Sequence, residues 1–269
     1  MQRKYLILLT MLAFLLIGSG LYLDRGSIRK RFTNDQPASL PPAVNANVSV
    51  ANSNQAITNG NRNAAVANAN RVTNTSVQLP SEYNLNVPFV QQAPTANWDA
   101  VHEEMCEEAA ALTVHYFWQG VSSPIAPQIE TQFSTIMAYE NTTFGDYKDT
   151  TAAQTAQFIN AVWGYKRVEV VPMHSLEDAQ QQVFAGRPVI IPSAGKLLEN
   201  PNFKNGGPLY HNLVIRGWLQ DGRIITNDPG TRKGNGYVYD ADVLWNAIHD
   251  WNGGDVTNGA KVMIVVYPN

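Results

Sequence analysis

Cys106, His211 and Asp228 are residue types that together can turn a thiol into a nucleophile. In such a site a thiolate attacks a carbonyl carbon, an imidazole moves the proton, and a carboxylate fixes the tautomer of the imidazole. Cys106 is the only cysteine of the chain, so it has no intramolecular disulfide partner. The three residues in this order therefore point to a thiol-dependent hydrolase of amide bonds.

Cys106 stands at the start of a stretch that is typical of a helix, residues 106–118, which Gly120 ends. The first N–H groups of a helix lack intrahelical partners and carry partial positive charge, so they stabilise a thiolate. The backbone N–H of Cys106 can also donate to the oxyanion of a reaction intermediate, with a glutamine side chain as the second donor. Gln91 and Gln92 are both of the right type for that role.

His211 and Asp228 flank two strand-like runs, residues 212–218 and 223–227. An Asp-Gly pair at residues 221–222 joins the runs and is typical of a tight hairpin turn. If the runs pair, His211 and Asp228 lie at the same open end of the hairpin. The sequence thus predicts that these two side chains meet.

Glutamates crowd the cysteine, and they argue against a reactive thiol. They are Glu103, Glu104, Glu107 and Glu108. Nearby carboxylates raise the pKa of a thiol, so we expect the activation of Cys106 to depend heavily on His211. A lone cysteine at a helix start is more often a small buried residue, and Asn-Asp-Pro-Gly at residues 227–230 is also a turn sequence. A domain that binds without turnover is therefore an alternative.

The composition excludes several classes of function. The formal net charge of -3 leaves no basic surface for nucleic acid. The five histidines and the cysteine show neither zinc-site spacing nor an HExxH pair, and the chain has no GxxxxGK[ST] loop of an ATPase. We therefore expect no metal, no other cofactor, no nucleic-acid partner and no ATPase domain in this chain.

The beginning of the chain predicts a membrane segment. Residues 5–23 are apolar and uncharged, long enough to cross a bilayer as a helix, and basic residues precede them. We interpret residues 1–32 as an uncleaved anchor, with a cleavable signal as the alternative because residues 18–20 are small. Basic residues at 25–31 favour a cytoplasmic domain by the positive-inside rule. A hydrophobic N-terminus ahead of a linker and a soluble domain favours export, and we predict a single-pass protein of the cell membrane with an extracytoplasmic domain.

The remainder divides into a linker and one folded domain. Residues 33–80 are rich in Asn, Ala, Ser and Thr and lack aromatic side chains, which predicts a disordered linker. Residues 81–269 hold all six tryptophans and can bury one core. Helices followed by a mostly antiparallel sheet indicate an α+β domain. Beyond the segments above, we predict helices at 150–163, 175–186 and 241–249 and strands at 168–171, 188–192 and 262–267.

The folded region resembles C39-like cysteine peptidase domains. The likeness lies in residues 87–99 (VPFVQQAPTANWD) and 106–109 of its first half, and in residues 211–218 and 225–231 of its second half. It covers roughly residues 85–269. The resemblance implies a papain-like cysteine peptidase fold, in which the helix that carries the cysteine packs on an antiparallel sheet.

The resemblance also implies a role for each candidate residue. Cys106 matches the nucleophile and His211 the general base. Asp228 matches the residue that orients the base, and Gln92, rather than Gln91, matches the donor to the oxyanion. The usual family pattern has Gly and Pro after the cysteine, where this chain has a pair of glutamates.

We therefore predict a thiol-dependent peptidase or amide hydrolase that acts on a peptide or protein and is tethered to the membrane through its N-terminal helix. One alternative is a module of the same fold that binds peptides or cell-wall material without turnover. The other is an acyl transferase that uses the same Cys-His-Asp triad.

Overall fold

The computed structural model describes residues 36–46 and 78–269 of the chain. The predicted membrane segment, residues 5–23, lies outside the described residues. Among the residues that are described, no helix is long and apolar enough to cross a membrane. The anchor therefore stays a prediction from the sequence.

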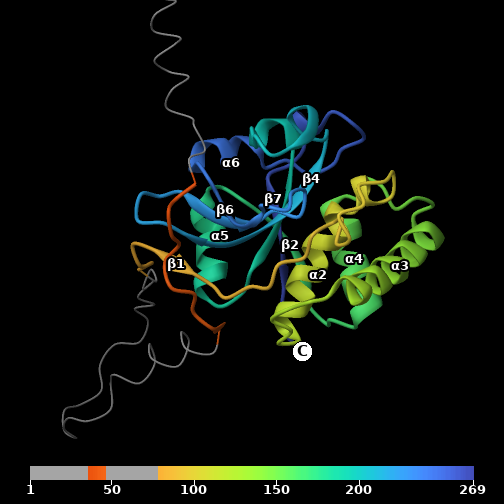
Figure 1. The fold of residues 1–269 in the computed structure, drawn as a ribbon, viewed down its shortest axis with the longest axis horizontal. Helices are drawn as coiled ribbons and strands as arrows, with labels where there is room; N and C mark the ends of the chain where they lie inside the picture. The colour runs from red at the N-terminus through yellow and green to blue at the C-terminus, as the bar shows by residue number, and fades with distance from the viewer. Residues whose placement is uncertain (1–35, 47–77) are drawn as a thin grey trace, which may run out of the picture. The chain divides into compact units, whose positions relative to one another are not determined.

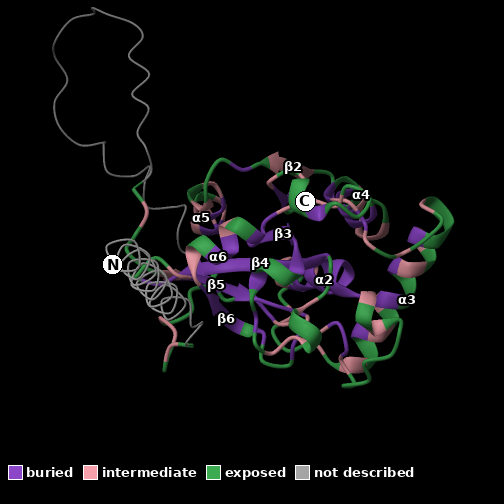
Figure 2. Ribbon diagram, turned by 90° about the horizontal axis from the view of Figure 1, so that it is seen from above, coloured by how far each residue is buried: buried purple, intermediate pink, exposed green. Residues whose placement is uncertain are grey.

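The domain is built on a seven-stranded sheet in which every pair of named strands is antiparallel. The main path across the sheet runs β2-β7-β3-β4-β5-β6, and β1 pairs with β4. The strands are β1 (Tyr83–Asn84), β2 (Val168–Pro172), β3 (Val189–Ser193), β4 (His211–Trp218), β5 (Ile224–Asn227), β6 (Asn235–Tyr239) and β7 (Val262–Val266). The central strands are buried along their length, as Figure 2 shows.

The helices carry the rest of the core. They are α2 (Cys106–Trp118), α3 (Ala126–Thr143), α4 (Ala152–Trp163), α5 (Leu176–Phe184) and α6 (Ala241–Ala247). Short 3-10 turns occur at η2 (His102–Glu104), η3 (Gly195–Leu198), η4 (Lys204–Gly206) and η5 (Val256–Asn258). The helix ends follow the sequence signals, because Thr151 and Ser175 form capping boxes and Gly164 ends α4 in the left-handed conformation at φ 73°.

Successive side chains of each strand point to opposite faces of the sheet, so the core has two parts, one on each face. Ile190, Val214 and Ile264 pack with α2 and α4 on one face. Their neighbours in sequence, such as Ile191 and Leu213, pack with α5 and α6 on the other face. Figure 1 shows α2, α3 and α4 grouped apart from α5 and α6. This mixed arrangement confirms the predicted α+β class.

Three of the strands and helices described above were not predicted from the sequence. They are the two-residue strand β1, the strand β6 and the helix α3, which has Pro127 in its first turn. The buried face of α3 holds Ile129, Phe133, Ile136 and Glu140, a helical spacing that would have identified it. Glu140 places a carboxylate in this otherwise apolar stripe.

Residues 36–46 belong to the stretch that the composition predicts to be linker, and here the structure differs. The side chain of Gln36 accepts from the Val238 N–H at 2.8 Å and donates to the Val238 carbonyl at 2.9 Å. Leu40 packs on a small apolar cluster of the sheet, and Val44 pairs with Leu85 in a parallel bridge. A few apolar side chains suffice to bind this segment to the domain, although its overall composition is polar.

Candidate active site

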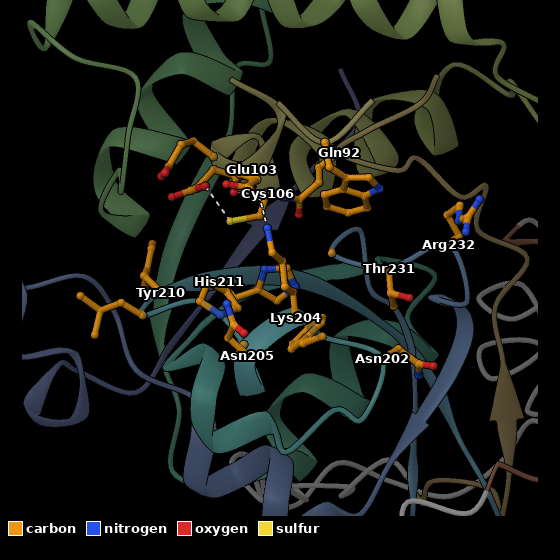
Figure 3. A pocket seen from close by; sticks show the side chains of 18 of the residues that line it. Gln92, Glu103, Cys106, Asn202, Lys204, Asn205, Tyr210, His211, Thr231 and Arg232 are labelled. Atoms are coloured by element: carbon orange, nitrogen blue, oxygen red, sulfur yellow. Dashed lines mark hydrogen bonds and ion pairs between the residues drawn. The ribbon is translucent and has the colours of Figure 1, made fainter. Parts of the chain in front are cut away.

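A pocket of about 850 Å³ lies between the start of α2 and the loops on either side of the β4–β5 hairpin (Figure 3). Gln92, Cys106 and His211 all line this pocket. Asp228 lies behind His211 and is fully buried. The structure thus brings together all four residues that the sequence singled out.

Cys106 is the first residue of α2 and is 5% exposed. Its Sγ lies 2.9 Å from Oε2 of Glu107, to which the thiol donates. The backbone N–H of Asn212 also points at the sulfur. Because Asn212 follows His211 in β4, this contact joins the start of the helix to the strand that carries the imidazole. Figure 3 shows Cys106 and His211 on facing sides of the pocket.

His211 is held by its contact with Asp228. The Nε2 atom of His211 lies 2.8 Å from Oδ1 of Asp228. No residue in the described ranges forms a hydrogen bond with the other ring nitrogen, Nδ1. That nitrogen is therefore available on the ring for a proton from a thiol or a substrate.

Asp228 is a buried carboxylate whose oxygens are all satisfied. Besides His211, its Oδ1 accepts from the Gly230 N–H at 3.0 Å. Its Oδ2 accepts from Asn200 Nδ2 at 3.1 Å and from the Tyr239 hydroxyl at 2.5 Å. Burial by itself raises the pKa of Asp228, but the charge of His211 and these donors hold it below the usual value. The ionised form that orients the imidazole is thus the stable one.

Gly230 allows the backbone to lie directly against the imidazole. A Cβ at this position would meet Cε1 of His211 at 2.8 Å and Cε1 of Phe203 at 2.9 Å. Phe203 itself contacts the His211 ring edge-on, with the ring centroids 5.2 Å apart. The His211 ring is therefore fixed by packing as well as by its hydrogen bond.

Gln92 reaches the pocket from the segment that precedes α2. Its Nε2 donates to the carbonyls of His102 at 2.9 Å and Glu103 at 3.2 Å, and its backbone N–H donates to Pro229. An amide nitrogen carries two hydrogens. If one hydrogen of Gln92 Nε2 is shared by the carbonyls of His102 and Glu103, the second hydrogen can be donated to an oxyanion. Gln91, the other candidate, is absent from the residues that line this pocket.

The charges around Cys106 oppose the thiolate. Burial raises the pKa of the Cys106 thiol well above its usual value, and the charge and hydrogen bond of Glu107 raise it further. Burial and the nearby Glu108 in turn raise the pKa of Glu107. The stable resting state is a neutral thiol beside a carboxyl group.

Glu108 and Glu140 form a second buried carboxyl group pair behind the first. Burial and then its neighbour Glu140 raise the pKa of Glu108. Burial raises the pKa of Glu140 to about 8. Two buried carboxyl groups that lie close together do not both ionise, so at least one of the pair is protonated near neutral pH.

Sequence reasoning missed Asn200, Tyr239 and Glu140. Asn200 and Tyr239 hold Asp228, and Glu140 adds to the carboxyl groups below Cys106. All three are distant in sequence from the residues they contact, so no local spacing marks them. Within the described part of the chain, no group of His, Cys, Asp or Glu side chains is arranged to hold a metal ion.

Comparisons with known proteins relate this chain to one family. A family model described as Peptidase_C39 like family matches residues 84–253. Among solved structures, a proposed C39-like peptidase from Bacillus anthracis is 16% identical, with a TM-score of 0.39 over 70% of this chain and 98% of that chain. No curated protein matches the chain. The extent of the family match, which includes both Cys106 and His211, shows that this chain belongs to the Peptidase_C39 like family.

Proposed function

We propose that the protein hydrolyses peptide or other amide bonds with Cys106 as the nucleophile. The observation that carries this proposal is the His211–Asp228 pair, which fixes an imidazole in the same pocket as a thiol at a helix start. Membership of a peptidase-type family supports the class of reaction. The pocket volume of about 850 Å³ is consistent with a peptide substrate.

In the proposed reaction, Nδ1 of His211 takes the proton of the Cys106 thiol as Sγ bonds to the carbonyl carbon of the substrate. The carbonyl oxygen becomes an oxyanion, which the N–H of Cys106 and Nε2 of Gln92 stabilise. The imidazolium then protonates the leaving amine, and the C–N bond breaks to leave a thioester. His211 next removes a proton from water as its oxygen attacks the thioester carbon. The C–S bond then breaks and the imidazolium returns the proton to Sγ, which releases a carboxylic acid and the free thiol.

Asp228 holds His211 in the required tautomer during both steps. Its ionised carboxylate accepts from Nε2–H, so Nδ1 is the nitrogen without a proton. The Cys106 thiol must leave Oε2 of Glu107 for His211 before it can react, because one S–H has one hydrogen to donate.

The proposal is tested by digesting a mixed peptide library with the full-length protein and identifying the products by mass spectrometry. Wild type should cleave, and Cys106→Ala should not. His211→Ala should lower the rate by about a hundredfold or more, as expected for loss of the general base. Cleavage that persists in Cys106→Ala, after purification from contaminating proteases, would show that the proposed nucleophile is wrong.

A binding module without turnover is the second candidate function. It is favoured by the neutral resting thiol, because burial raises the pKa of Cys106 and the charge of Glu107 raises it further. The rate at which iodoacetamide alkylates Cys106, measured at a series of pH values, distinguishes a catalytic site from a binding module. A catalytic site should lose much of its labelling rate in His211→Ala, whereas a binding module should label at the same slow rate in both proteins.

We also propose that the domain lies outside the cytoplasm and is tethered by residues 5–23. The apolar character of that segment supports the proposal. Protease added to intact cells should degrade the domain while a cytoplasmic marker survives. A domain that is protected until the cells are lysed would reverse the proposed orientation.

A further inference from the structure

One side of the pocket is lined by carboxyl groups next to the nucleophile. These groups belong to Glu104, Glu107 and Asp149, which we call the acidic wall. Glu104 and Asp149 are partly exposed, whereas Glu107 is 1% exposed. Within the described ranges, neither lysine nor arginine forms an ion pair with any of the three. The acidic wall thus lacks a counter-charge of its own.

Glu107 also has a buried oxygen without a partner. Its Oε2 accepts from Cys106, but its Oε1 has no hydrogen-bond partner among the residues described. A buried acceptor that is left unsatisfied is destabilising. Because Glu107 lines the pocket, a rotation of its carboxyl group would bring this oxygen within reach of a donor that enters beside Cys106.

Other charged groups near the acidic wall are mostly negative. Burial raises the pKa of Asp149, and the charges of Glu104 and Asp146 raise it further, against the opposing effect of Lys148. Lys148 is exposed, and its Nζ lies 5.9 Å from the centre of the Tyr147 ring. The buried carboxyl groups of Glu108 and Glu140 lie behind Glu107.

The positive charges that line the pocket come from other segments of the chain. Lys204 pairs with Glu103 at 3.4 Å, so these two charges offset each other. Arg232 and Lys233 line the part of the pocket formed by the loop after β5. Figure 3 shows Arg232 on the far side of Gln92 from Cys106. The pocket therefore carries the acidic wall on the side of α2 and two basic side chains on the side of the loop after β5, while Lys204 is paired with Glu103.

We propose that the acidic wall binds a positively charged side chain of the substrate, lysine or arginine, close to the bond that Cys106 attacks. The inference rests on the proposed function and names its substrate class. An ammonium or guanidinium group can donate to Oε1 of Glu107 and pair with Glu104 and Asp149.

A bound cation also changes the electrostatics at the nucleophile. Burial raises the pKa of the Cys106 thiol most, and repulsion by the charge of Glu107, a member of the acidic wall, raises it further. A cation between the carboxylates offsets that repulsion, so a cationic substrate promotes the ionisation that its own cleavage requires. The preference should weaken as the pH falls, since the carboxyl groups of the acidic wall become protonated and neutral.

Cleavage specificity provides the first test. In the mixed library, wild type should cut next to lysine or arginine, and replacing arginine by uncharged citrulline should lower kcat/KM by about tenfold or more. Asp149→Asn and Glu104→Gln should each reduce the ratio of kcat/KM for the arginine peptide to kcat/KM for the citrulline peptide. Glu82→Gln removes the same charge from an exposed position outside the pocket and should leave the ratio unchanged.

Binding to the inactive Cys106→Ala protein provides the second test, because it does not require catalysis. An arginine peptide that is cut by wild type, or failing that acetyl-Gly-Arg-Gly-amide, should bind about tenfold more tightly than its citrulline counterpart. The difference should become smaller when Asp149→Asn is added. Equal binding of the two peptides would overturn the inference, even if wild type proves to be a peptidase. A clear difference in binding without any cleavage by wild type would instead reject the proposed catalysis and keep the cation site.

Discussion

His211 is the residue whose position the structure specifies most completely. Asp228 holds one nitrogen, Phe203 contacts the ring edge, and the backbone of Gly230 lies against Cε1. The pairing of His211 with Asp228 follows from the sequence, because the hairpin brings both to one end. The role of Gly230 does not, since a glycine after proline is first of all a turn residue.

Substitution of Gly230 tests how closely the imidazole must be held. The added methyl group of Gly230→Ala would overlap His211, so the ring must shift by several tenths of an ångström. We expect kcat to fall by about ten- to a hundredfold, because small errors in the position of a catalytic group are costly. The measurement is peptide hydrolysis, with circular dichroism to show that the protein is folded.

Gly222→Ala is the control for this substitution. Gly222 lies in the turn of the same hairpin, where a Cβ would meet no atom within 4 Å, although φ is +87°. We expect a loss of about 1 kcal/mol in stability and unchanged kcat. Equal activity of the two variants would show that the contact with His211 is unimportant for the rate.

The neighbouring strands β4, β5 and β6 place the groups around Asp228. His211 begins β4, Asp228 follows the end of β5, and Tyr239 ends β6. The hairpin of β4 and β5 was predictable from its alternating runs and its Asp-Gly turn. The third strand was not, because Asn235 and Gly236 at its start do not favour a strand.

Loss of the Tyr239 hydroxyl should weaken the support of Asp228. Tyr239→Phe removes the 2.5 Å hydrogen bond to Oδ2, which leaves a buried carboxylate with one fewer donor. We expect a loss of about 1 to 3 kcal/mol in unfolding free energy. We also expect the acid limb of the pH–rate profile to move to higher pH, because the donor lowers the pKa of Asp228.

Tyr237→Phe is the matched control on β6. It removes the same hydroxyl from the same strand and leaves the bond between Tyr239 and Asp228 intact. Denaturant unfolding and the pH–rate profile should both distinguish the two variants. If both variants shift the acid limb equally, Tyr239 has no special effect on Asp228.

At the scale of the whole molecule, the packing of α3 against α2 places carboxyl groups inside the domain. Glu108 and Glu140 come from these two helices and are both fully buried. Burial raises the pKa of Glu140 to about 8, while an unfolded chain gives it a value near 4.5. The folded protein therefore binds this proton more tightly than the unfolded protein does.

This difference predicts how stability depends on pH. The raised pKa of Glu140 stabilises the folded protein. The full contribution is present below about pH 4.5, and it is lost as the pH rises through about 8. The glutamine in Glu140→Gln is uncharged at every pH. The stability of this variant relative to wild type should therefore rise between pH 5 and pH 8, because only wild type loses stability over that range. At pH 8 we expect its Tm to exceed that of wild type by about 3 °C or more.

Comparison with Glu140→Gln at each pH isolates this effect from other titrating groups. Burial lowers the pKa of His115 to about 4, so His115 lowers stability below about pH 6.5 in both proteins. Glu82→Gln, an exposed change, controls for the removal of one charge. A Tm difference between wild type and Glu140→Gln that stays constant from pH 5 to pH 8 would contradict the prediction.

The sequence by itself determined the α+β class, the helix that begins at Cys106 and the meeting of His211 with Asp228. These features depend on periodicity, turns and helix ends within short segments, which local patterns express. Only the tertiary structure decided that Glu107 holds the thiol and that Glu140 lies behind Glu108. It also decided that Asn200 and Tyr239 hold Asp228. Those contacts depend on how side chains orient and how distant segments pack, and no spacing along the chain records that packing.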